Sequence, residues 1–133
     1  MRTEMKPSEN IFRALGKLFY AIAAVDHRVH LQEFEILGTI ISKEHFPDNN
    51  KEATHSTNSS EIIESFYSIL QEKIPAYDAF KEFVSYKQAN EHEFSPQMKK
   101  WIWKIADKIC YSFAAKNKSE VIILSKLKST LQE

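Results

Sequence analysis

Two carboxylates and two imidazoles gather around a predicted turn in the first third of the chain. Asp26 and Glu33 are seven residues apart, and His27 and His30 lie between them. Carboxylate oxygens that converge at such a joint suit calcium, and an added imidazole also suits zinc. We therefore consider a divalent-cation site, calcium or zinc, with Asp26, His30 and Glu33 as ligands. A structural interpretation fits the same residues, because Asp26 can form an Asx turn and Glu33 can stabilise the start of the next helix.

Three lysines lie at one helical spacing in the last third of the chain. Lys100, Lys104 and Lys108 are at positions i, i+4 and i+8, with Trp101 and Trp103 beside them. Such a face could bind an anionic surface, either lipid headgroups or nucleic acid. The alternative is a solvated face that is partly neutralised by acidic side chains from elsewhere in the chain.

The charge distribution favours docking of the two parts of the chain on each other. Residues 1–95 contain ten Lys or Arg and fifteen Asp or Glu, whereas residues 96–133 contain eight and three. The whole chain has no net charge, so nothing global attracts it to nucleic acid, and we expect no nucleic-acid partner. We expect an unknown protein partner.

Signatures of catalysis are absent from the sequence. Cys110 is the only cysteine and lies in an apolar helical pattern, which predicts an inert core thiol. Gly16 and Gly38 are the only glycines and cannot form a phosphate-binding loop. We therefore predict a non-enzymatic protein. A metal-dependent hydrolase that uses water on a metal at Asp26, His30 and Glu33 is the third hypothesis.

Apolar periodicity predicts an all-α fold. A chain of 133 residues is the size of one domain, here 1–133, and no strand-like alternation occurs. We expect a bundle of about six helices in which the apolar helix 96–115 is central, and a mobile polar loop at 46–60. The helices are expected at 7–25, 31–45, 61–73, 76–90, 96–115 and 120–131.

Individual residues refine this expectation. Ser95 followed by Pro96 predicts a helix start. The two glycines lie inside helices, where they are expected to permit close helix packing. The last helix is expected to direct four residues inward, namely Val121, Leu124, Leu127 and Leu131.

Neither a signal peptide nor a transmembrane segment is expected. The first ten residues lack the apolar run and cleavage site of a signal peptide, and the longest apolar run, 18–25, has eight residues. We therefore expect a cytoplasmic protein.

The turn at Asp26 resembles the first motif of the TerB-like domain family, which includes the tellurite-resistance protein TerB and the co-chaperone DjlA. That motif reads Ala-x-x-Asp-Gly-x-(Val/Ile)-x-x-x-Glu followed by an apolar helix. Ala23, Asp26, Val29, Glu33 and Leu37 fit it, and His27 stands at the glycine. A weaker second copy at 113–124 retains the acidic residue, Glu120, and the apolar run, whereas Lys116 and Asn117 replace Asp-Gly.

The resemblance implies two degenerate helix-turn-helix repeats covering nearly the whole chain. It further implies a stress-related role through protein interaction or a divalent ion. Carried over by position, it assigns the ion to Asp26 and Glu33, with Glu120 as a remnant of the second site.

Overall fold

The computed structural model describes residues 7–25, 29–44, 52–113 and 118–132. These residues form a single bundle of six α-helices and one 3-10 turn, and they contain no strand. The elements are α1 (Pro7–Ala24), α2 (Leu31–Lys43), α3 (Glu52–Glu72), α4 (Ala76–Ala89), η1 (Glu91–Glu93), α5 (Pro96–Phe113) and α6 (Lys118–Gln132). The all-α prediction is confirmed. None of the helices is long and apolar enough, over the part described, to span a membrane.

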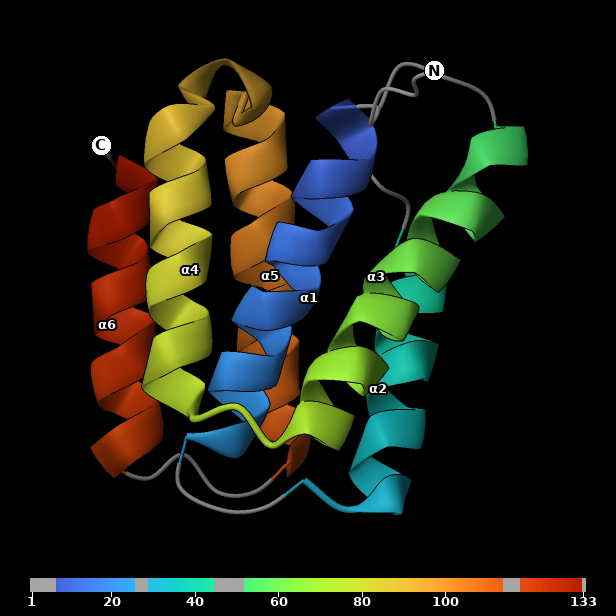
Figure 1. Cartoon of the computed structure of the whole chain (residues 1–133), viewed down its shortest axis with the longest axis vertical. Helices are drawn as coiled ribbons and strands as arrows, with labels where there is room; N and C mark the ends of the chain where they lie inside the picture. The colour runs from blue at the N-terminus through green and yellow to red at the C-terminus, as the bar shows by residue number, and fades with distance from the viewer. Residues whose placement is uncertain (1–6, 26–28, 45–51, 114–117, 133) are drawn as a thin grey trace.

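Helix α1 occupies the centre of the bundle, a position that the sequence predicted for the helix now labelled α5. It contacts α3, α4, α5 and α6, and Figure 1 shows it between α4 and α6 on one side and α2 and α3 on the other. Between Ile11 and Ala23 every residue is buried except Arg13 and Lys17. Helix α5 cannot be surrounded in this way, because its lysines keep one side in water.

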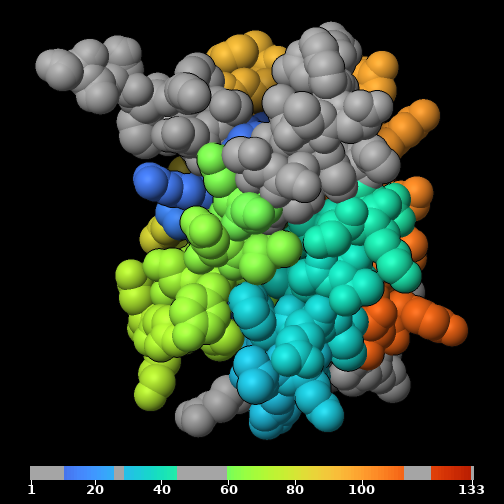
Figure 2. All heavy atoms as spheres, turned by 90° about the vertical axis from the view of Figure 1, so that its right-hand side faces the viewer, coloured from blue at the N-terminus to red at the C-terminus, as the bar shows by residue number. Residues whose placement is uncertain are grey.

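Helix α2 covers the outer side of the bundle together with α3. It contacts α3 and α5, and in Figure 2 α2 and α3 lie side by side across one face. Phe34 of α2 packs between two α3 rings, with centroid distances of 5.8 Å to Phe66 and 5.4 Å to Tyr67. Phe66 also contacts Tyr20 of α1 at 5.8 Å, so aromatic side chains connect the three helices.

Helix α3 begins nine residues earlier than the sequence predicted. The polar stretch 52–60, expected to belong to a mobile loop at 46–60, is helical, whereas residues 46–51 lie outside the described part. Ser, Thr and Asn cost only about 0.5 kcal/mol each in a helix relative to Ala, and neither Gly nor Pro occurs between 52 and 72. A helix nucleated by its packed half can therefore extend through such residues.

Three of the four residues predicted to face inward from α6 are buried, and Val121 is the exception. Val121 is 52% exposed, whereas Ile123 is fully buried together with Leu127; Leu124 and Leu131 are also buried, as expected. Because residues 121–124 are all apolar, two neighbouring helix faces fit the sequence equally well at this end. Thr130 is buried as well, and its hydroxyl donates a hydrogen bond to the Lys126 carbonyl at 2.9 Å.

Gly16 permits the close approach of α1 and α3, as the sequence predicted. A Cβ placed there would lie 2.5 Å from both Cβ and Oγ of Ser65 and 3.0 Å from the carbonyl oxygen of Ile62. The Ser65 hydroxyl donates a hydrogen bond to the Arg13 carbonyl at 3.0 Å, which joins the two backbones at this point. Gly38 is different, because a Cβ there meets only Cδ1 of Ile63 at 3.9 Å.

Gly16→Ala is therefore expected to lower the free energy of unfolding by about 1–3 kcal/mol, because the backbones must separate. Gly38→Ala is the matched control and should be neutral or stabilising by up to about 1 kcal/mol. Urea denaturation followed by circular dichroism measures both. The second substitution Ser65→Gly should recover part of the loss in Gly16→Ala. Equal effects at the two glycines would contradict the close-approach interpretation.

Lys73 is the non-glycine residue with a positive φ in the described chain, at 57°. It follows the last residue of α3, and its N–H donates to the Leu70 carbonyl at 3.2 Å. This is the position after a helix where glycine is preferred. Lys73→Gly should therefore stabilise the fold by about 1 kcal/mol, because the left-handed conformation costs glycine nothing. Lys73→Ala, which keeps the Cβ, should show no such gain when thermal unfolding of the two variants is compared.

Candidate functional site

The first predicted site lies at the start of α2, where Glu33 acts as a helix cap. His30 is extended (φ −95°, ψ 162°), and its backbone N–H donates to Oε1 of Glu33 at 3.0 Å. The His30 carbonyl then accepts the N–H of Phe34 at 3.0 Å, which begins the helix. This geometry is that of a capping box, in which the carboxylate at the third helical position satisfies an N–H before the helix. The structural role considered for Glu33 is thus present in the fold.

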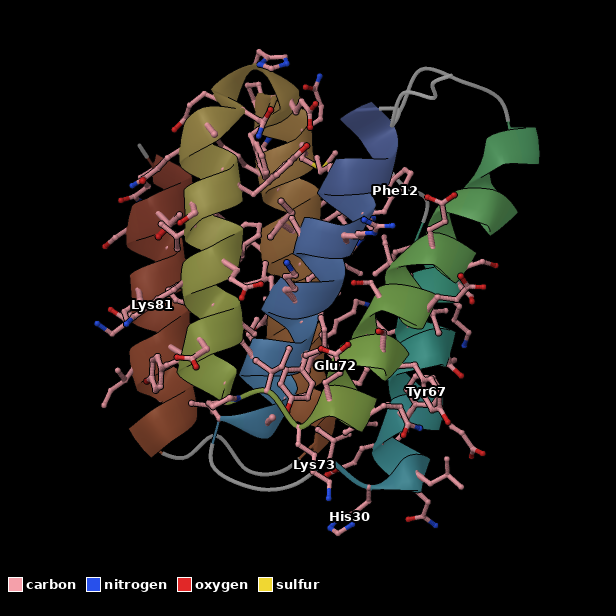
Figure 3. All side chains as sticks on the ribbon, viewed as in Figure 1. Phe12, His30, Tyr67, Glu72, Lys73 and Lys81 are labelled. Atoms are coloured by element: carbon pink, nitrogen blue, oxygen red, sulfur yellow. The ribbon has the colours of Figure 1, made fainter. Side chains whose placement is uncertain are left out.

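The described residues alone do not assemble a metal centre around this cap. Asp26 and His27 lie outside the described residues, as does the side chain of Glu120 in the first turn of α6. Elsewhere in the described chain, no three His, Cys, Asp or Glu side chains lie close enough to hold an ion. His30 is exposed at the end of the molecule (Figure 3). The cation site at Asp26, His30 and Glu33 therefore stays a prediction.

A cavity of about 380 Å³ lies beside Val29, near the predicted hydrolase site. Its lining comes from the ends of α1, α3 and α4 and includes Tyr20, whose hydroxyl donates to the Ile74 carbonyl at 2.7 Å. Burial raises the pKa of this hydroxyl, which keeps it protonated. Among the lining residues none carries a carboxylate or an imidazole. The described part of the cavity lining therefore contributes no ligand or base to the hydrolase hypothesis.

Two of the three lysines predicted to face an anion are paired within the fold. Nζ of Lys104 lies 3.1 Å from Oε1 of Glu44, and Nζ of Lys108 lies 3.1 Å from Oε2. Glu44 directly follows α2, so its carboxylate bridges α2 to α5. Hydrogen bonds from Lys104 and Lys108 lower the pKa of Glu44 below its ordinary value. The acidic first part of the chain thus docks on the basic last part, as the charge distribution predicted.

Glu44→Gln is expected to lower the free energy of unfolding by about 0.5–1 kcal/mol at pH 7, because both lysines remain largely exposed. The folded pKa of Glu44 lies below the unfolded one, so this contribution is present above pH 4.5 and disappears as the pH falls through the folded pKa. Urea denaturation at pH 7 and in the acid range checks both statements. Glu35→Gln, on an exposed part of α2, is the control and should have little effect. A difference between wild type and Glu44→Gln that persists in acid would contradict the assignment.

The third lysine, Lys100, lies in a groove between α5 and α6. We call it the α5–α6 groove; it has a volume of about 330 Å³ and is lined by Lys99, Lys100, Trp103, Lys128, Leu131 and Gln132. Helix α6 runs antiparallel to α5 (Figure 1), so the first turns of α5 face the last turn of α6. Leu131 is buried, Trp103 is half-buried, and the remaining polar side chains form the rim. No acidic side chain is among these lining residues.

Sequence reasoning identified Lys100 but missed Lys99 and Lys128. Lys99 is detectable, because it lies four residues before Trp103 and therefore on the same face of α5. Lys128 belongs to another helix, and its place in the groove depends on how α6 packs against α5. Helical periodicity shows which side of a helix is apolar and does not show which helix covers it.

A larger cavity of about 610 Å³ lies between α1, α3 and α4. It contains charges of both signs, and the ammonium group of Lys17 is paired with Oε1 of Glu82 at 2.7 Å. This ion pair joins α1 to α4 across the cavity, and Glu72 lies at its α3 edge (Figure 3). The described lining of this cavity has two basic and four acidic side chains, so the cavity is net acidic and offers no site for an anion.

A buried lysine that the sequence did not reveal lies at the end of α4. Lys87 has no exposed surface, and its Nζ lies 3.0 Å and 3.2 Å from the two carboxylate oxygens of Glu91. Next to it, the Tyr86 hydroxyl donates to the Glu93 carboxylate, and burial followed by this hydrogen bond raises the pKa of Tyr86. Both pairs join α4 to η1. They hold the connection to α5 and explain why a polar segment is ordered there.

Comparisons with known proteins do not add a relative. No model of a protein family matches the chain, and neither a curated protein nor a solved structure matches it. The α5–α6 groove and the cap at Glu33 therefore provide the physical basis for a functional proposal.

Proposed function

We propose that this chain is a non-enzymatic helical domain that binds an anionic ligand at the α5–α6 groove. The carrying observation is that three lysines, Lys99, Lys100 and Lys128, line a groove at which none of the described lining residues carries a carboxylate. Because like charges at a common rim raise the local potential together, such a groove attracts anions even on a chain without net charge.

The proposal changes the predicted anion-binding face. Glu44 pairs with both Lys104 and Lys108, so these two lysines together add only one net positive charge to that face. Lys100 keeps its predicted role, and Lys99 and Lys128 take the place of the two lysines that are paired with Glu44. The resulting site is compact and crosses from one helix to another, in place of a stripe along α5.

We further propose that the domain is TerB-like, on the strength of its first motif. The apolar motif residues Ala23, Val29 and Leu37 are buried, and Glu33 caps α2. These roles support a motif that builds a helix-turn-helix joint. A stress-related function through a partner protein is consistent with this assignment, and a calcium or zinc ion at Asp26 and Glu33 remains the second part of the same proposal.

Binding to anionic probes tests the groove. The probes are poly-glutamate, single-stranded DNA, phosphatidylserine vesicles and inorganic phosphate, each at low and physiological salt. The groove variant carries Lys99→Gln, Lys100→Gln and Lys128→Gln. The control variant carries Lys43→Gln, Lys73→Gln and Lys81→Gln, which removes the same charge from exposed lysines that do not line the groove.

At least one probe should bind the wild type about tenfold more tightly than the groove variant, since three exposed ion pairs contribute roughly 0.2–1 kcal/mol each. The control variant should stay within about threefold of the wild type, because its lysines do not line the groove. Equal loss in the two variants, or no binding of any probe to the wild type, would overturn the proposal. Circular dichroism of all three proteins verifies that each is folded.

A further inference from the structure

We infer that the occupant of the α5–α6 groove is an acidic segment of a partner protein that inserts one apolar side chain between Trp103 and Leu131. This inference rests on the proposed anion-binding function and specifies its ligand. It follows from three features of the groove, which are its apolar floor, its two-sided shape and the limited extent of its positive charge.

The floor of the groove is apolar, although its rim is cationic. Leu131 is buried and Trp103 is half-buried, and both line the groove between the lysines. A simple anion would pair with the ammonium groups and leave this floor in contact with water. An occupant that matches both features carries an aromatic or aliphatic group flanked by negative charges.

The shape of the groove favours a large partner over a free small molecule. Only α5 and α6 line it, so it has walls on two sides, and its volume of about 330 Å³ is near the lower limit for ligand pockets. Small molecules are usually held by burial of most of their surface, which two walls cannot provide. A segment of a protein gains further contacts outside the groove.

The position of the apolar residues argues against a membrane as the occupant. A membrane-binding surface inserts protruding apolar side chains among its basic residues. Here Leu131 lies at the base of the groove with 7% of its surface exposed, and the exposed lining residues are polar. The groove can therefore accept an apolar group from a ligand, but it has no protruding apolar side chain to insert into a membrane.

The extent of the positive charge argues against nucleic acid. A phosphate backbone is normally followed by a track of basic residues over several nucleotides. On α5 such a track is weakened after Lys100, because Lys104 and Lys108 share the carboxylate of Glu44 and the three groups together carry one net positive charge. Lysines on both walls instead suit a short segment with carboxylates on each side of its apolar anchor, since Lys99 and Lys100 come from α5 and Lys128 from α6.

Fluorescence anisotropy with synthetic peptides tests this assignment on the wild-type protein. One labelled peptide has a central phenylalanine flanked by three glutamates on each side, and its partner has serine in place of the phenylalanine. The phenylalanine peptide should bind at least about tenfold more tightly, because only it covers the apolar floor. The groove variant should lose binding of the phenylalanine peptide, and the control variant should retain it.

Trp103→Leu provides a second measurement that preserves an apolar floor. It should keep a preference for phenylalanine over serine but reduce it, since the aromatic contact is lost. Equal binding of the two peptides to the wild type would overturn the inference while leaving anion binding intact. Binding of phosphatidylserine vesicles or single-stranded DNA that depends on the groove lysines, without binding of either peptide, would have the same meaning. If no anion binds in a manner that depends on Lys99, Lys100 and Lys128, the inference and the proposed function both fail.

Discussion

The burial of α1 on nearly all sides is the constraint on which the rest of this structure depends. Four helices pack against it, so its side chains determine where each of them lies. The contact at Gly16 and Ser65 sets the distance between α1 and α3, and Phe66 of α3 then positions Phe34 of α2. Phe19 makes the corresponding link to α5 through Trp101, with ring centroids 6.0 Å apart. A small displacement of α1 would therefore also move α2, because Phe66 of α3 contacts both helices.

A central apolar helix also determines where charged groups can lie. They must be placed on the outer helices or be paired where those helices meet, because an unpaired buried charge is costly. Glu44 joins α2 to α5 by this means, and Lys87 with Glu91 joins α4 to η1. In both clusters, the charged side chains pair with each other and connect neighbouring elements of the fold. The lysines of the α5–α6 groove differ, because none of its described lining residues offers them a carboxylate.

The sequence predicted the helix boundaries well wherever local signals act alone. Ser95 accepts the N–H of Met98 at 3.1 Å, as a residue before Pro96 at a helix start should, and apolar spacing located α1, α2 and α4 closely. The sequence-based predictions were wrong where packing between helices determines which residues are buried. Which of two apolar helices is central depends on how all six pack, and the choice between Val121 and Ile123 for the core depends on how the first turns of α6 pack. The α5–α6 groove could not be predicted because it includes Lys128. Helical periodicity does not show which helix packs beside the one that carries Lys128. The possible ligands around Asp26 were identified from the sequence. Of these, the structure describes only His30 and Glu33.

Stability and ligand binding are separable in this arrangement. The core derives its stability from apolar burial around α1, and exposed lysines add little to it, since solvent screens their interactions. The positive charges of α5 fall into two groups. Lys104 and Lys108 are partly neutralised by Glu44, whereas the described lining of the groove supplies no negative charge to its lysines. Three like charges around one groove repel one another and are not needed to close the core. The proposed ligand would supply negative charge there without disturbing the core.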